Sequence, residues 1–130
     1  MMEIIKTYLV TLVVLTTLDG LWLGFITKNF YQKYLGYIFT DKVVWWPVAV
    51  FYPLYSIGIL VFVLLPALEA KSLGMAVWRG ALLGLVAYGA YDLTNQATLA
   101  KWPIAITLAD LSWGVVVSAL VSALAYLIMK

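Results

Sequence analysis

The chain has 130 residues, of which 65% are hydrophobic and 11% charged, and its formal net charge is +2. About 25% of the residues of a soluble domain are charged, so this composition excludes an ordinary soluble protein and predicts a membrane protein. The chain lacks cysteine and histidine, so no disulfide, metal site or other cofactor is expected, and no basic run indicates nucleic acid binding.

Four stretches are long and apolar enough to cross a bilayer, which takes about 20 mostly apolar residues. They are expected at residues 4–26, 46–68, 75–97 and 103–129. Little chain lies outside these spans, and none of them has the polar face of a soluble helix. The predicted fold class is therefore all-α: an integral membrane four-helix bundle, formed as a single domain of residues 1–130 and surrounded by lipid.

The longest connection, Thr27 to Val44, follows the first span and mixes lysines with tyrosines and phenylalanines. We expect a partly helical segment at the membrane interface, with its aromatic rings at the level of the headgroups. The connections and termini place four basic residues on each side of the membrane. The positive-inside rule therefore does not decide the orientation.

The second and fourth spans begin alike, with Trp46–Pro47 and Trp102–Pro103. Proline suits the first turn of a helix, and tryptophan suits the membrane interface. Two explanations stay open: shared helix-start chemistry, or a two-plus-two internal repeat. In a repeat the first and third spans would be equivalent, and each carries an aspartate near its end, Asp19 and Asp92.

Three aspartates are predicted to lie at one depth in the membrane. Asp19 is nine residues from Lys28, and Asp92 and Asp110 are each nine residues from Lys101. At 1.5 Å per residue, each carboxyl lies about 13 Å along its helix from its flanking lysine. Because these lysines are on the same side of the membrane, the three acids should share one leaflet.

Small residues at a spacing of four accompany two of these acids, and such stripes let membrane helices approach closely. The stripes are Gly80-Gly84-Tyr88-Asp92 and Asp110-Gly114-Ser118-Ser122. We therefore expect the acids to face the interior of the bundle rather than lipid. The pairs Asp19 and Trp22, Asp92 and Asn95, and Asp110 and Trp113 each share a helix face.

Buried carboxylates need compensation, because an ionised aspartate at the centre of a membrane helix costs about 3 kcal/mol. No basic residue is expected at their depth. Three outcomes stay open: some aspartates are protonated, hydrogen-bond donors satisfy them, or a cation binds from outside. We predict that Asp92 is the central acid, because the donors of Thr94, Asn95 and Gln96 follow it directly.

Six motifs together resemble an uncharacterised family of small predicted bacterial membrane proteins, a domain of unknown function. The motifs are LDGLWLG (Leu18–Gly24), FYQKYLG (Phe30–Gly36), FYPLYSIGILVF (Phe51–Phe62), LLPAL (Leu64–Leu68), YDLTNQATLAKWP (Tyr91–Pro103) and LADLSWG (Leu108–Gly114). The most specific is YDLTN-x-ATL-x-x-WP. The resemblance implies a multi-pass protein of the bacterial inner membrane but supplies no reaction.

The candidate site combines the three acids with the polar and aromatic residues around them. Its members are Asp19, Trp22, Tyr91, Asp92, Thr94, Asn95, Asp110 and Trp113. The first functional hypothesis is binding or transport of a proton, a cation or an amphipathic small molecule, with a hydrophobic cation or a lipid as the candidate ligand and a homodimer completing the pathway. The second is a membrane enzyme that uses aspartate acid–base chemistry on a lipid or isoprenoid. The third is a structural subunit of a membrane complex, in which the acids only fix the helix packing.

Overall fold

The computed structural model describes residues 1–130 as helices joined by short turns, with no strand. The elements, in chain order, are α1 (Met2–Leu21), the π-helical segment η1 (Trp22–Ile26), α2 (Lys28–Leu35), α3 (Trp45–Ile59), the π-helical segment η2 (Leu60–Leu64), α4 (Leu65–Ala70), α5 (Leu73–Thr98) and α6 (Ile104–Met129).

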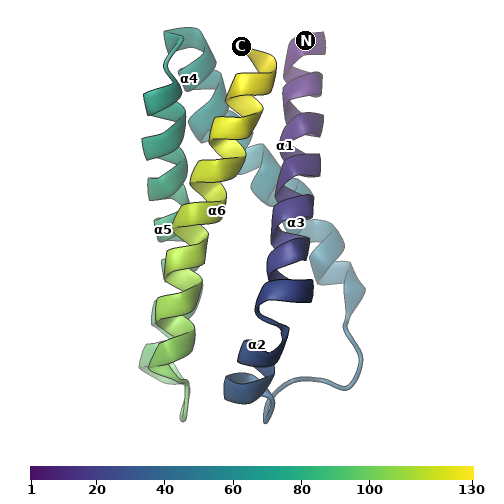
Figure 1. The fold of residues 1–130 in the computed structure, drawn as a ribbon, viewed down its shortest axis with the longest axis vertical. Coiled ribbons are helices and arrows are strands. Elements are labelled where there is room, and N and C mark those ends of the chain that lie inside the picture. Colours follow the sequence, from purple (N-terminus) through teal and green to yellow (C-terminus); the bar gives the residue numbers. More distant parts are fainter.

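Four helical rods are long and apolar enough to cross a membrane, which confirms the predicted all-α membrane bundle. They comprise Met2–Ile26, Trp45–Ala70, Leu73–Thr98 and Ile104–Met129, so their ends differ from the expected ones by at most two residues. Both termini and the α4–α5 turn lie at one end of the bundle, and α2 and the α5–α6 turn lie at the other (Figure 1). We call these the termini end and the α2 end.

The closest helix packing joins α5 to α6, along the two predicted stripes of small residues. A Cβ atom added at Gly80 would lie 2.6 Å from Ser122 Oγ and 2.7 Å from the Ser118 carbonyl oxygen. A Cβ atom at Gly84 would collide with the carbonyl oxygen of Gly114. The absence of side chains therefore brings the two backbones together, and this contact places the Asp92 end of α5 beside the Asp110 end of α6.

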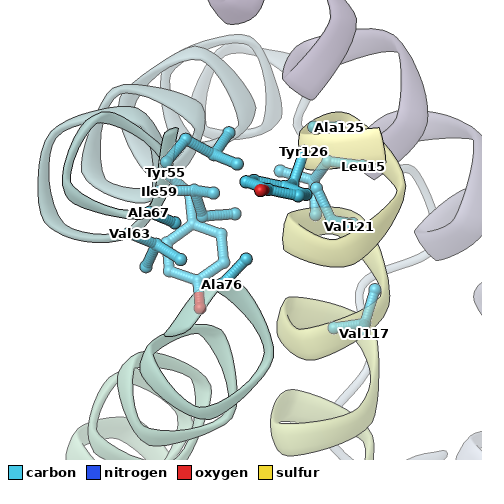
Figure 2. Close-up of a cluster of buried hydrophobic side chains, with 11 residues drawn as sticks. Leu15, Tyr55, Ile59, Val63, Ala67, Ala76, Val117, Val121, Ala125 and Tyr126 are labelled. Atoms are coloured by element: carbon cyan, nitrogen blue, oxygen red, sulfur yellow. The ribbon is translucent and has the colours of Figure 1, made fainter. Parts of the chain in front are cut away.

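The apolar core lies between the rods in the half of the bundle nearer the termini end. Figure 2 shows its side chains gathered between α3–α4, α5 and α6, with Leu15 contributed by α1. Within this core the hydroxyl groups of Tyr55 and Ser118 are 2.7 Å apart, so two buried polar groups satisfy each other. The outer surface of the bundle is apolar, as a lipid-facing surface must be; Phe25, for example, is 81% exposed.

The connection between the first two spans is partly helical, as expected, whereas the internal repeat stays one of two explanations for the similar Trp–Pro openings. The structure does not show the two-plus-two repeat, and the similar Trp–Pro openings lie in different surroundings: Trp46 is 71% exposed, whereas Trp102 is 6% exposed. The Thr27–Val44 connection is helical only over Lys28–Leu35. Its aromatic rings do not all lie at the interface, because Tyr31 reaches into the bundle to Asp110 on α6.

Candidate functional site

Asp19 lies in the last turn of α1, and two side chains from other helices satisfy its carboxyl group. The indole N–H of Trp113 on α6 donates to Oδ1 over 2.7 Å. The hydroxyl group of Tyr52 on α3 donates to Oδ2. The residue is only 6% exposed. This carboxyl therefore joins α1, α3 and α6 through hydrogen bonds, and both of its oxygens have a partner.

Asp110 accepts a hydrogen bond at Oδ1 from the hydroxyl group of Tyr31 on α2. The Tyr31 oxygen in turn accepts the indole N–H of Trp22 over 3.3 Å. Tyr31 lies outside the membrane spans, and its burial, together with the Asp110 carboxyl, raises its pKa well above the usual value. Its hydroxyl group consequently stays protonated and remains a donor to Asp110 at all physiological pH values.

The rings of Trp22 and Trp113 stack between these two carboxyl groups, with centroids 4.2 Å apart and planes 3° from parallel. Both tryptophans follow an aspartate by three residues, as the sequence indicated. Neither indole N–H bonds the aspartate of its own segment. Trp113 donates to Asp19, and Trp22 donates to the Tyr31 hydroxyl group, which in turn donates to Asp110. The two D-x-x-W segments thus exchange hydrogen bonds across the α1–α6 contact.

Asp92 differs from the other two acids. Its exposed fraction is 0%, and no hydroxyl, indole, amide or backbone N–H group of the chain donates to either carboxyl oxygen. The neighbouring ionisable group is the carboxyl of Asp110. The prediction that the following polar residues would supply donors was wrong for Thr94, whose hydroxyl group bonds the backbone carbonyls of Ala90 and Tyr91 in its own helix.

The remaining polar residues of the YDLTN motif shape the α5–α6 turn. Gln96 donates from Nε2 to the carbonyl oxygen of Trp102 over 2.9 Å, and its Oε1 accepts the hydroxyl group of Thr107 over 2.8 Å. The Trp102 indole donates to that same hydroxyl oxygen over 3.0 Å. Lys101 takes the left-handed conformation, with φ of 65°, and turns the chain. Gln96 therefore holds the turn closed and is not available to Asp92.

A cavity of about 390 Å³ opens at the α2 end of the bundle. Its walls carry two carboxyl groups and one lysine, and most of the other lining side chains are aromatic. The lining residues are Asp19, Trp22, Leu23, Lys28, Tyr31, Leu35, Phe39, Tyr88, Tyr91, Trp102, Asp110 and Trp113. Asp92 is not in the wall but lies behind Asp110 in the α5–α6 contact.

The structure brings together five of the eight residues that the sequence singled out, and these five line the cavity: Asp19, Trp22, Tyr91, Asp110 and Trp113. Asp92 adjoins it, whereas Thr94 and Asn95 do not line it. Sequence reasoning missed the two tyrosine donors, Tyr31 and Tyr52. A signal existed, because the pattern F-Y-x-x-Y occurs at Phe30–Tyr34 and again at Phe51–Tyr55, and the first tyrosine of each pattern donates to an aspartate of a membrane span.

The chain has no group of three or more acidic, histidine or cysteine side chains arranged to hold a metal ion. The geometry offers an aromatic cavity with two carboxyl groups and one lysine in its wall and a further buried carboxyl group behind it. Together with the four apolar rods, it defines a class of protein: a multi-pass membrane bundle with an acidic, aromatic cavity at one end.

The chain belongs to the family described as "Predicted membrane protein (DUF2177)", whose family model matches residues 4–127. This match confirms the resemblance found in the sequence. No curated protein and no solved structure matches the chain.

Proposed function

We propose that this protein binds an amphipathic organic cation in the cavity at the α2 end and exchanges it for a proton held by Asp92 and Asp110. The observation that carries this proposal is the Asp92 carboxyl group, which is fully buried, accepts no hydrogen bond from a hydroxyl, indole, amide or backbone N–H group of the chain, and lies against the Asp110 carboxyl group. We further propose that the protein acts in the inner membrane of a bacterium, because the motifs resemble a bacterial family.

A purely structural cluster would be expected to satisfy its buried members, since an unpaired buried polar group costs about 1–3 kcal/mol. Asp19 meets that expectation and Asp92 does not. Two neighbouring carboxyl groups, one of which is fully buried, cannot readily both be ionised, so one proton between Asp92 and Asp110 removes their repulsion. A cation that binds beside Asp110 neutralises part of the negative charge of the pair, so the pair can release its proton. Binding of the cation and loss of the proton are therefore coupled.

The cavity suits the rest of such a ligand. Faces of tryptophan and tyrosine attract cations by up to about 2 kcal/mol when water is excluded, and several such rings line the wall. The apolar surface of Leu23 and Leu35 accommodates a hydrophobic body. Movement of a ligand across the whole membrane would require a second copy of the chain, because four short spans leave little room for a pathway.

The test uses the purified protein in detergent and tetraphenylphosphonium as the probe. Because Trp22 and Trp113 line the cavity, binding should change the tryptophan fluorescence. A pH-sensitive dye in weakly buffered solution should report proton release on binding to the wild type. Asp92→Asn should retain the fold, abolish that release and weaken binding by about tenfold, which corresponds to about 1.4 kcal/mol.

The matched control is Asp41→Asn, which changes an exposed aspartate in the connection between α2 and α3. It should bind the probe and release protons as the wild type does. If Asp92→Asn also binds and releases protons like the wild type, the exchange proposal is wrong and the structural hypothesis gains. If the probe does not bind but an added isoprenoid or lipid is chemically altered, with loss of that activity in Asp92→Asn, the enzyme hypothesis replaces it.

A further inference from the structure

Arg79, the only arginine of the chain, lies inside a membrane span and has no acidic partner. It is the seventh residue of α5, which begins at Leu73, so it lies about 9 Å along the helix from its start. The only ion pair in the structure joins Lys6 to Glu3, both near the N-terminus. This end of α5 is at the termini end of the bundle, away from the acidic cavity (Figure 1).

The chain uses only part of the hydrogen-bonding capacity of this guanidinium group. Nη1 donates to the backbone carbonyl oxygen of Phe62, in η2, over 3.1 Å. Nε is buried and has no partner. A guanidinium group has five N–H donors in a planar fork, and the edge formed by Nε and Nη2 matches two oxygens of a phosphate. The Nε–Nη2 edge has no hydrogen-bond partner in the chain, so a phosphate oxygen pair matches it once the side chain rotates to bring Nε into the hollow.

A lipid-facing hollow of about 310 Å³ lies beside this arginine. Arg79 is its one charged residue, and the other lining residues are apolar: Phe62, Trp78, Leu82, Leu83 and Val86. Leu82 and Val86 are 52% and 61% exposed on the outside of the bundle. Val86 is seven residues beyond Arg79, about 10 Å deeper in the membrane along the same helix face.

From this arrangement we infer an anionic phospholipid site, with the phosphate on Arg79 and an acyl chain along Leu82 and Val86. The phosphate lies at the level of the lipid headgroups, because Arg79 is near the end of its span. The acyl chain of the lipid continues from there towards the membrane centre. On insertion scales an arginine costs about 3 kcal/mol at the centre of a span and less near its end, and a phosphate on the unpartnered Nε lowers this cost. No carboxyl group lines the hollow to receive a headgroup amine, so an anionic lipid is preferred to a zwitterionic one.

The experiment is native mass spectrometry of the full chain released from detergent after incubation with phosphatidylglycerol, with phosphatidylcholine or with inorganic phosphate. The wild type should retain one phosphatidylglycerol in preference to the other two. Arg79→Gln should reduce that retention at least about tenfold, equal to about 1.4 kcal/mol. Lys71→Gln, which removes an exposed charge from the same end of the bundle, should retain the lipid as the wild type does.

A second variant keeps the test decisive if Arg79→Gln does not fold. Val86→Trp fills the hollow from the lipid side and leaves the guanidinium group intact, so it should also lower retention. Quenching of fluorescence by phosphatidylglycerol with brominated acyl chains should be smaller in Trp78→Phe than in the wild type. Equal retention of phosphatidylglycerol by the wild type and Arg79→Gln, or equal retention of phosphatidylcholine and phosphatidylglycerol by the wild type, would overturn the inference.

Discussion

The surroundings of Asp19 and Asp92 form the most informative contrast in the molecule. Both are buried aspartates near the α2 end of a membrane helix. Asp19 accepts an indole N–H and a phenol O–H from two other helices. Asp92 has no donor and has another carboxyl group, that of Asp110, as its neighbour.

The contrast teaches that the same residue type at a similar depth can have both carboxyl oxygens satisfied in one place and receive no donor in another. What differs is the set of groups that neighbouring helices present. Tyr52 and Trp113 supply donors to Asp19, whereas Asp92 has no such donor and has a second acid beside it. The following predictions test this contrast, from the largest expected effect to the smallest.

Gly84→Leu should abolish the Asp92–Asp110 pair and cause the largest loss of stability. Any side chain at this position collides with the Gly114 carbonyl, and both partners are backbone of packed helices, so α5 and α6 must separate. We expect a loss of about 3 kcal/mol in the free energy of unfolding, at the upper end for overpacking. Titration with sodium dodecyl sulfate, followed by circular dichroism, measures it.

The control is Gly20→Leu on α1, because a Cβ atom at Gly20 meets nothing within 4 Å. This variant should unfold at nearly the wild-type detergent concentration. Equal destabilisation by both leucines would show that the close α5–α6 approach is not what holds the Asp92 region together.

Asp19→Ala and Asp92→Ala should differ in their effect on stability. Loss of the Asp19 carboxyl strands the donors of Trp113 and Tyr52, and at about 1 kcal/mol for each group, the lower end of the range, the loss is about 2 kcal/mol. Loss of the Asp92 carboxyl strands no donor and removes two unpartnered oxygens, so we expect a change below about 1 kcal/mol. Unfolding titrations of the two variants in the same detergent provide the comparison, and equal losses would remove the distinction between the two acids.

Tyr52→Phe should cost less than Asp19→Ala, because Asp19 keeps the Trp113 bond. One hydrogen bond to a charged group contributes about 1.5–3 kcal/mol, and the smaller value applies where the second donor remains. Tyr8→Phe on α1, outside this network, is the control. If Tyr52→Phe is as stable as the control, the hydrogen bond from the Tyr52 hydroxyl group to Asp19 contributes nothing to the free energy of unfolding.

Tyr31 should give the smallest effect, visible only at alkaline pH. Burial and Asp110 raise its pKa above the usual value, so the stability that its hydroxyl contributes is complete below about pH 10 and falls as the pH rises through the raised pKa. The wild type should therefore exceed Tyr31→Phe in stability at about pH 8 by more than at about pH 11. Unfolding titrations at both values measure this, and a constant difference would contradict it.

The sequence by itself determined the architecture, because the signals for it are local. Twenty-residue apolar runs define the four spans, and Gly80 and Gly84 opposite Gly114 predict a close helix contact without any knowledge of the fold. Counting residues from the flanking lysines also sufficed to indicate that the three aspartates lie near one end of the bundle, since the rise per residue of a helix is constant.

Only the tertiary structure decided which side chain meets which. Thr94 and Gln96 follow Asp92 in sequence but bond their own helix and the α5–α6 turn, whereas Tyr52, thirty-three residues from Asp19, is its partner. Hydrogen-bond partners across helices depend on rotation and crossing of the rods, and small residues set these through close contact. That is why one buried carboxyl group became satisfied and the other remained without a partner.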